Sequence, residues 1–316
     1  MRNGNWTDIY TDFISAAAER VCQNWVEIPC GKCLGCRLEY SRQWANRCLL
    51  ENEYHESSYF VTLTYDQEHV PETWYPDPST GEALRALTLR KRDFQLFMKR
   101  LRKHTGQEIR YFAAGEYGTK TFRPHYHAII FGLKLDDLTI VKKSPLGYPY
   151  YTSQTILRAW SVQQQGGSYA PLGQIIVAPV TWETCAYTAR YTAKKNGTQG
   201  SEYFASMNLE PPFVLMSRRP GIGNQWYVEH ADLFDHAFIN ISTETGGKKF
   251  RPPKYFYNLL EKDNPKFAEC LKDIRKANMD KYHKDKLLNT DLDYLDLLEV
   301  EERALQNRTK SLERRL

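Results

Sequence analysis

A chain of 316 residues with 41% hydrophobic side chains is long and apolar enough to bury one large or two modest cores, which excludes a wholly disordered protein. Its net charge of +5 permits a nucleic-acid partner but excludes the extreme balance of a histone-like protein. No apolar run approaches the roughly twenty residues that span a membrane, and residues 1–8 lack the apolar region of a signal peptide. We therefore expect a cytoplasmic protein with no membrane partner.

The seven cysteines do not form the even set of a secreted disulfide framework, so reduced thiols or a metal site are expected. Three of them are clustered in Cys30-Gly-Lys-Cys33-Leu-Gly-Cys36. One interpretation is a structural Zn²⁺ site or an iron–sulfur cluster, with Cys22 or Cys48 as the fourth ligand. The other is a glycine-containing turn of reduced thiols. The spacing leaves both open.

The first half of the chain alternates helical and strand patterns. Hydrophobic periodicity and strand-forming residues predict, in order, a helix over 37–56, a strand over 59–65, a proline-rich loop over 71–81, an amphipathic basic helix over 89–104, and a strand over 109–116. A polar segment over 117–123 is short enough to join that last strand to an apolar run over 124–131 as a hairpin.

The second half begins with an apparent insertion over 133–173 that contains one short helix. A strand over 175–179, a helix that starts near Thr181, a strand over 211–216, and charged helices from about 248 follow. Asn196-Gly197 would end the helix, because both residues tolerate the left-handed conformation. We predict an α+β fold with a central, mainly antiparallel sheet, divided into a domain over 1–247 and a charged helical region over 248–316.

The apolar run over 124–131 contains two histidines, His125 and His127. Alternate residues of a strand share a face, so both imidazoles would point the same way, and the hairpin would bring Glu116 close to them. Two imidazoles and one carboxylate can hold Mg²⁺ or Mn²⁺ and leave positions for water and a phosphate oxygen. His69 is a poorer third ligand. The alternative is that the histidines satisfy local hydrogen bonds and Glu116 faces solvent.

The predicted helix that follows carries Tyr187 and Tyr191, which are four residues apart and so share a helix face. A phenol with its ordinary pKa near 10 attacks poorly, so a nucleophilic tyrosine needs neighbouring cations or a base. Three cations lie within one turn of the second tyrosine: Arg190, Lys194 and Lys195. The alternative is that both rings pack at the edge of the core.

A further basic loop follows the strand predicted over 211–216. It contains Arg218, Arg219, Gly221 and Gly223. Glycine lets backbone amides approach an anion and arginine forks around one, so the loop is a candidate phosphate contact. The same residues also suit an ordinary turn.

Three motifs in order, Val61-Thr-Leu-Thr64, Arg123-Pro-His125-Tyr126-His127 and Tyr187-x-x-x-Tyr191-x-x-Lys194-Lys195, resemble those of HUH endonucleases, specifically the two-tyrosine replication initiators of small single-stranded DNA phages. Residues 29–37 and Arg219-Pro-Gly-Ile-Gly223 further resemble the gokushovirus branch of the Microviridae. The resemblance covers about residues 29 to 225.

The resemblance implies an HUH nuclease fold with an RRM- or ferredoxin-like core and a metal-dependent endonuclease and strand transferase that initiates rolling-circle replication. It implies that His125 and His127 bind the metal, that Tyr187 and Tyr191 are alternating nucleophiles, and that Lys194 or Lys195 steadies the phosphate. The implied partners are single-stranded DNA at a replication origin and the helicase and polymerase of a bacterial host. Contacts to DNA are expected from four arginines: Arg123, Arg190, Arg218 and Arg219.

Two other functions fit parts of the sequence. A non-catalytic protein could coat single-stranded DNA through the cysteine cluster and the 21 tyrosines and 7 tryptophans, because bases stack on aromatic rings. It would bind without metal and would not cut. The other alternative is a related single-strand transposase or relaxase. The paired tyrosines followed by lysines argue against it.

Overall fold

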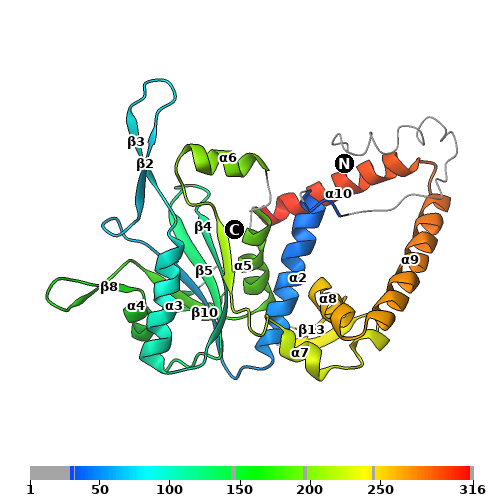
Figure 1. The fold of residues 1–316 in the computed structure, drawn as a ribbon, viewed down its shortest axis with the longest axis horizontal. Helices are drawn as coiled ribbons and strands as arrows, with labels where there is room; N and C mark the ends of the chain where they lie inside the picture. Colours follow the sequence, from blue (N-terminus) through cyan, green and yellow to red (C-terminus); the bar gives the residue numbers. More distant parts are fainter. Residues whose placement is uncertain (1–28, 32, 144–146, 195–197, 244–245, 314–316) are drawn as a thin grey trace. The chain divides into compact units, whose positions relative to one another are not determined.

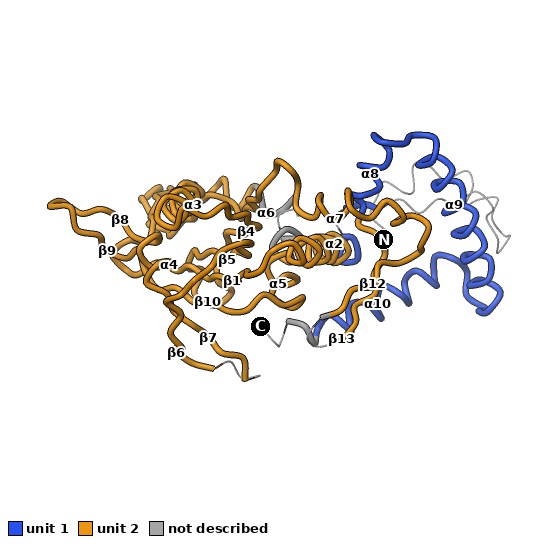
Figure 2. The backbone as a smooth tube through the Cα atoms, turned by 90° about the horizontal axis from the view of Figure 1, so that it is seen from below, with its two compact units in different colours: residues 1–36, 254–316 blue, residues 37–253 orange. Residues whose placement is uncertain are grey.

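The computed structural model describes residues 29–31, 33–143, 147–194, 198–243 and 246–313 (Figure 1); the side chains of 191–194, 198–201, 243 and 311–313 are outside this description. The chain forms two compact units, one over 37–253 and one that combines 1–36 with 254–316 (Figure 2). The predicted α+β class is confirmed. The domain boundary at residue 247 stays a prediction, because compactness does not establish that a segment folds alone.

The larger unit is built on a seven-stranded sheet in which every neighbouring pair is antiparallel. Its strands, in spatial order, are β11 (Phe213–Met216), β4 (Arg110–Tyr117), β5 (Pro124–Phe131), β1 (Ser58–Thr64), β10 (Ile175–Pro179), β7 (Pro149–Thr152) and β6 (Thr139–Lys143). The histidine strand, β5, is thus bonded on one side to β4 and on the other to β1. The histidine strand therefore lies inside the sheet and not at its edge.

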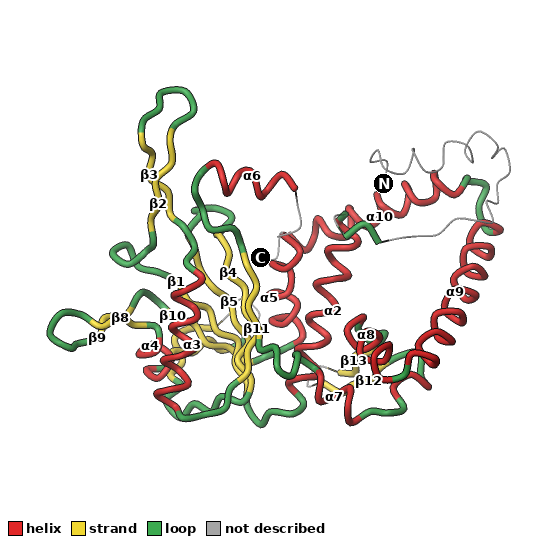
Figure 3. The backbone as a smooth tube through the Cα atoms, in the orientation of Figure 1, coloured by secondary structure: helices red, strands yellow, loops and turns green. Residues whose placement is uncertain are grey.

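The two faces of the sheet carry different cores, and the alternation of side chains along β5 separates them. Tyr126, Ala128 and Ile130 enter a core that includes Phe94 and Phe97, and the side chains of that core come from this face and from α3 (Lys91–Thr105) and α4 (Gln154–Ala159). On the opposite face, Ile129 and Phe131 pack with residues of α2 (Leu34–Asn52) and α5 (Trp182–Lys194). Figure 3 shows the course of α5 beside the sheet. His125 and His127 alternate with Tyr126 along β5, so their side chains lie on this second face.

A buried carboxylate ties the end of α2 to the sheet. Glu51 is 4% exposed, accepts a hydrogen bond from the backbone N–H of Gly223 (2.7 Å), pairs with the guanidinium of Arg110, and lies 3.4 Å from Nε2 of His55. Burial alone would raise the pKa of Glu51, but these donors outweigh burial and hold it below its ordinary value of 4.5. The hydrogen bond from Gly223 also holds the loop that precedes this glycine against the end of α2.

We expect Glu51→Ala to lower the free energy of unfolding by about 3 kcal/mol, because it leaves the Arg110 charge and the Gly223 N–H without their buried acceptor. Because the carboxyl pKa is depressed in the fold, its contribution is complete above pH 4.5 and is lost as the pH falls below that value. Urea unfolding between pH 7 and pH 3 measures both effects. Glu56→Gln is the control, because the Glu56–Lys134 pair is exposed and its loss should leave stability unchanged.

Two segments differ from the sequence-based prediction. The expected loop at 71–81 is part of a hairpin of β2 (Glu72–Pro76) and β3 (Ala83–Leu87), whose turn is held by Asp77 accepting from the backbone and hydroxyl of Ser79. The supposed insertion over 133–173 adds β6 and β7 to the main sheet and forms a second hairpin of β8 (Ser161–Gln163) and β9 (Tyr169–Pro171). Prolines at strand ends made both segments look like loops.

The rest of the chain is mainly helical. It includes three short helical elements: α6 (Thr198–Ser206), α7 (Asn224–Glu229) and a 3₁₀ turn (Leu233–Asp235). A hairpin of β12 (Ile239–Thr243) and β13 (Gly246–Phe250) comes next, so the charged helices begin at 254 and not at 248. These helices are α8 (Lys254–Asp263), α9 (Pro265–Leu288) and α10 (Tyr294–Glu313). None of the described helices is both long and apolar enough to cross a membrane. The predicted helix stop at 196–197 lies outside the described residues.

Candidate metal centre and nucleophile

The register of the β4–β5 hairpin places Glu116 directly opposite His125, and His127 follows on the same face of β5. Oε1 of Glu116 lies 2.8 Å from Nε2 of His125 and 3.1 Å from Nε2 of His127. Glu116 and His127 are buried, whereas the side chain of His125 is partly open to solvent. The hairpin therefore brings together the three side chains that the sequence proposed as one ligand set, and their ligand atoms converge within 4.8 Å.

The outer nitrogens of both imidazoles are held by neighbouring groups. Nδ1 of His125 lies 3.1 Å from the backbone oxygen of Arg123, and Nδ1 of His127 lies 3.0 Å from the hydroxyl of Thr62 on β1. A carbonyl oxygen only accepts hydrogen bonds, so Nδ1 of His125 carries a proton. Such contacts fix the ring orientation and tautomer of metal-binding histidines. Both Nε2 atoms are thereby directed toward Glu116.

This arrangement suits a cation. With Nδ1 protonated, a neutral His125 would present the lone pair of Nε2 to a carboxylate oxygen 2.8 Å away, which is repulsive unless a proton or a metal ion lies between them. Two imidazole nitrogens and a carboxylate oxygen are ligands that Mn²⁺ accepts readily, and Mg²⁺ takes the carboxylate with water and phosphate oxygens. The donor set therefore fits the divalent ion expected from the sequence.

The three side chains of the centre shift one another's pKa values. Burial tends to raise the pKa of Glu116, but the hydrogen bonds and charges of His125 and His127 outweigh it and lower that pKa to about 2. Burial lowers the pKa of His127, partly offset by the carboxylate. Glu116 is thus an anion and His127 is biased toward the neutral form, which are the protonation states that a metal ligand requires.

Two other predicted residues near the hairpin have protein partners. His69 is paired with Asp66, with Nδ1 2.9 Å from the carboxylate, so Glu116 and not His69 joins the two histidines. The guanidinium of Arg123 donates to the backbone oxygens of Tyr65 and Asp66, at 3.1 and 3.0 Å. These contacts hold the hairpin against the end of β1, and contact of Arg123 with DNA stays a prediction.

The helix α5 brings one predicted nucleophile to this centre. Its start is capped reciprocally: Thr184 N–H donates to the hydroxyl of Thr181 (3.2 Å), and Thr181 N–H donates to that of Thr184 (2.8 Å). The hydroxyl of Tyr187 lies 3.4 Å from Nε2 of His127, and the two rings meet edge to face with centroids 4.8 Å apart. Phe60 stacks on His127 with ring centroids 5.5 Å apart and also meets Tyr187 edge to face. The hydroxyl of Tyr187 therefore lies next to one of the three proposed metal-ligand atoms.

The remaining helix residues are only partly described. Tyr191 is one turn beyond Tyr187 in α5, but its side chain and that of Lys194 lie outside the described residues, as does all of Lys195. Arg190 is partly exposed on the same helix. Their roles therefore stay predictions.

The basic loop lies at the opposite end of the sheet from the metal centre. Met216 pairs with Phe112, and the oxygen of Pro220 accepts from Arg110, at the far end of β4 from Glu116. Glu116 is six residues after Arg110 along β4, so the two positions are about 20 Å apart along the strand. Arg218 and Arg219 are exposed there, so their predicted contacts, if made, would be to DNA away from the reacting phosphate.

Other groups of this loop already have partners in the protein. The oxygen of Ile222 accepts from the side chain of Arg47, at 3.0 and 2.9 Å, and the Gly223 N–H donates to Glu51. The Gly223 amide is therefore not available to bind an anion, contrary to one interpretation of this glycine.

Sequence reasoning did not single out an aromatic stack beside the centre. Tyr117, next to Glu116, stacks on Phe122 (4.5 Å between centroids) and on Phe204 of α6 (5.6 Å), and Tyr203 meets Phe122 edge to face. Phe122 and Tyr203 are 39% and 46% exposed. Phe122 has a φ of +52°, which is uncommon for a bulky residue. Only the tertiary pairing of the hairpin with α6 reveals this stack.

Known proteins resemble the segment that contains both the proposed metal ligands and Tyr187. A model of the replication-associated protein ORF2 family matches residues 58–196, from β1 through the histidine strand to α5. The replication-associated protein ORF2 of Spiroplasma virus 4 is 33% identical over 297 residues, which cover 92% of this chain and 85% of that protein. The chain belongs to the replication-associated protein ORF2 family.

Two further similar proteins come from other phages. The replication-associated protein VP4 of Bdellovibrio phage phiMH2K is 30% identical and covers 75% of this chain and 68% of its own length. The replication-associated protein ORF4 of Chlamydia phage 1 is 29% identical over 53% of this chain and 38% of its own length. No solved structure matches the chain. The predicted kinship with Microviridae replication proteins is confirmed.

Proposed function

We propose that this member of the family nicks single-stranded DNA at a replication origin, becomes linked to the 5′ end through tyrosine, and later rejoins the ends. Membership of the family supports a role in phage replication. The observation that carries the finer proposal is the position of the Tyr187 hydroxyl, 3.4 Å from an imidazole nitrogen that, with His125 and Glu116, forms a ligand set for a divalent cation.

In the proposed reaction the phenolic oxygen of Tyr187 attacks phosphorus. The new O–P bond forms as the bond from phosphorus to the 3′ oxygen breaks, and the proton lost by the phenol is balanced by the one that the 3′ hydroxyl gains. His125, His127 and Glu116 would hold Mg²⁺ or Mn²⁺, which supplies Lewis-acid polarisation of the phosphate when bound. Thr62 and the Arg123 carbonyl would keep both imidazoles aimed inward, and the His127 contact orients the phenol.

A second tyrosine on the same helix explains how ends could be rejoined. The phosphotyrosine retains the energy of the broken phosphodiester, so transfer of the first end needs no nucleotide triphosphate. Tyr191 is four residues after Tyr187, which is the spacing of one helical turn. A protein that cut once and hydrolysed its product would need a single nucleophile. The helicase and polymerase partners and the cytoplasmic site of action belong to this proposal.

The test is the formation of a covalent adduct. Labelled single-stranded fragments that tile the genome encoding this chain are incubated with the protein and Mn²⁺, and the products are resolved under denaturing conditions. We expect one fragment to give a labelled band at the mass of protein plus DNA, and EDTA to abolish it. Binding without scission would instead indicate the non-catalytic coating protein, and free cut fragments without an adduct would indicate hydrolysis by water.

The aromatic stack beside the centre supports a track for unpaired bases. We expect Phe122→Ala to weaken single-stranded DNA binding about tenfold, because stacking of one base on an aromatic ring is worth about 1–3 kcal/mol. Fluorescence anisotropy without divalent metal measures the affinity separately from cutting. Tyr282→Ala is the control, since Tyr282 is an exposed aromatic of the other unit. Equal losses in both variants would argue against a specific role of Phe122.

A further inference from the structure

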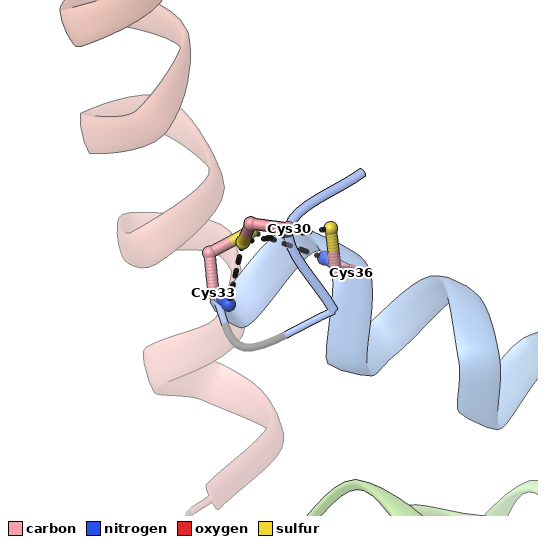
Figure 4. A group of neighbouring side chains, drawn as sticks. All are labelled: Cys30, Cys33 and Cys36. Atoms are coloured by element: carbon pink, nitrogen blue, oxygen red, sulfur yellow. Dashed lines mark hydrogen bonds between the residues drawn. The ribbon is translucent and has the colours of Figure 1, made fainter. Parts of the chain in front are cut away.

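The three clustered cysteines come together in a turn before and within the first turn of α2 (Figure 4). Sγ of Cys30 lies 4.0 Å from Sγ of Cys36, and the sulfur atoms of Cys30, Cys33 and Cys36 all lie within 4.8 Å of one another. We propose that these three thiolates bind one Zn²⁺ ion. This proposal is independent of the nicking reaction.

The sulfur spacing favours a single ion over a polynuclear cluster. Two thiolates on one tetrahedral Zn²⁺, each with a Zn–S bond of about 2.3 Å, lie about 3.8 Å apart. The 4.0 Å separation of Cys30 and Cys36 matches that edge. In a 4Fe–4S cluster each cysteine ligates a different iron atom, and in a 2Fe–2S cluster only two cysteines share one iron, so three cysteine ligands of either cluster spread farther apart than the three sulfurs here. The turn is too narrow for such a cluster without rearrangement.

Backbone N–H groups of the turn donate to two of the three sulfurs, while burial and the neighbouring thiols raise the pKa of the Cys33 thiol to about 11. The N–H of Cys33 donates to Sγ of Cys30 (3.2 Å), and the N–H of Cys36 donates to Sγ of Cys33 (3.4 Å). Hydrogen bonds to the charged form stabilise it, and Cys36 also lies in the first helical turn, where the helix dipole favours a negative charge. Gly31, with a φ of +71°, provides the left-handed residue that lets the chain curl back. Such donors commonly support metal-bound thiolates.

The other described cysteines have different surroundings. Cys48, one of the fourth ligands suggested by the sequence, is fully buried in the core of the larger unit together with Cys185, whose thiol interacts with it. Cys270 is exposed on α9 and is not part of the cluster. Among the described residues, three protein ligands therefore converge. Cys22, the other fourth ligand suggested by the sequence, lies outside the described residues. A disulfide between Cys30 and Cys36 would use only two of the three converging thiols.

The site has a clear structural role within its own compact unit. A methyl group added at Gly35, between the last two cysteines, would lie 3.5 Å from Cδ2 of Leu305 and 3.9 Å from Sγ of Cys33, so α10 passes beside the turn. Figure 4 shows that helix next to the three side chains. A bound ion would fix the turn against which α10 packs, in a segment with few buried side chains of its own.

The experiment must separate this site from the histidine centre. The reduced full-length protein is stripped of metal and titrated with Co²⁺, because sulfur-to-cobalt charge transfer in the near ultraviolet reports thiolate ligands alone. We expect one equivalent of Co²⁺ to produce that band and Zn²⁺ to displace it. Cys30→Ser, at an exposed position before the helix, should remove the band and weaken Zn²⁺ binding at least about 100-fold.

Two matched variants complete the design. Cys270→Ser, which removes an exposed thiol elsewhere, should retain the band, and so should His127→Ala, which disrupts the other centre. Circular dichroism confirms that each variant is folded. Absence of the band in the reduced wild-type protein, or its retention in Cys30→Ser, would overturn the proposal. Absence of nicking by the wild-type protein, with the band intact, would refute the proposed function and leave the zinc site standing.

Discussion

Replacement of both Tyr187 and Tyr191 by phenylalanine should abolish the covalent adduct, with a loss of at least about 1000-fold in cutting. The double change keeps both rings and so keeps the edge-to-face contact of Tyr187 with His127. It removes only the hydroxyl oxygens, which are the atoms proposed to attack phosphorus. The fold and single-stranded DNA affinity should be nearly unchanged, because phenylalanine keeps the ring of each tyrosine and removes only its hydroxyl.

The adduct assay with the active origin fragment provides the measurement. Tyr40→Phe is the matched control, since Tyr40 is an exposed tyrosine of α2 and its variant should cut like wild type. Single variants extend the test: if the two phenols alternate, each should still form some adduct but should fail to rejoin ends. An unchanged adduct in the double variant would show that the nucleophile lies elsewhere.

Glu116→Gln should lower metal-dependent cutting at least about 100-fold while preserving the shape of the side chain. Glutamine has no negative charge to offset a divalent cation, and its amide can donate to one imidazole nitrogen, which then cannot bind metal. The loss should appear both as weaker Mn²⁺ binding by calorimetry and as a higher Mn²⁺ concentration needed for half-maximal cutting. Excess Mn²⁺ should restore part of the activity if chemistry itself is intact.

Glu82→Gln serves as the control for this substitution. Glu82 is exposed in the turn of the β2–β3 hairpin, so removal of its charge should leave Mn²⁺ binding unchanged. Wild-type cutting with an unaltered Mn²⁺ dependence in Glu116→Gln would exclude Glu116 as a ligand, despite its 2.8 and 3.1 Å distances to the two histidines.

The sequence was sufficient to predict the geometry of the metal centre because that geometry is local. Alternation along a strand puts His125 and His127 on one face, and a short hairpin fixes which residue of β4 lies opposite. The same face receives α5, whose Tyr187 hydroxyl lies 3.4 Å from Nε2 of His127. The reciprocal threonine cap explains why the helix begins where the sequence suggested.

Features that depend on distant pairing were not predictable in this way. Nothing near Thr62 in the sequence indicates that its hydroxyl would orient His127, since that contact requires β1 to pair with β5 in one register. The attachment of β6 and β7 to the edge of the sheet, and the partners of Arg123, likewise depend on segments far apart in the chain. The position of Arg218 and Arg219 followed only from the pairing of β11 with β4.

The ladder bonds on both sides of the histidine strand limit how the protein can move during the proposed strand transfer. Separation of His125 from His127, or of either from Thr62, would require breaking the pairing of β5 with β1 or β4. The sheet is therefore a rigid support. In the proposed reaction, a DNA end would then pass from one phenol to the next through a shift or roll of α5, or through movement of the nucleic acid past this helix, while the ligand set stays in place.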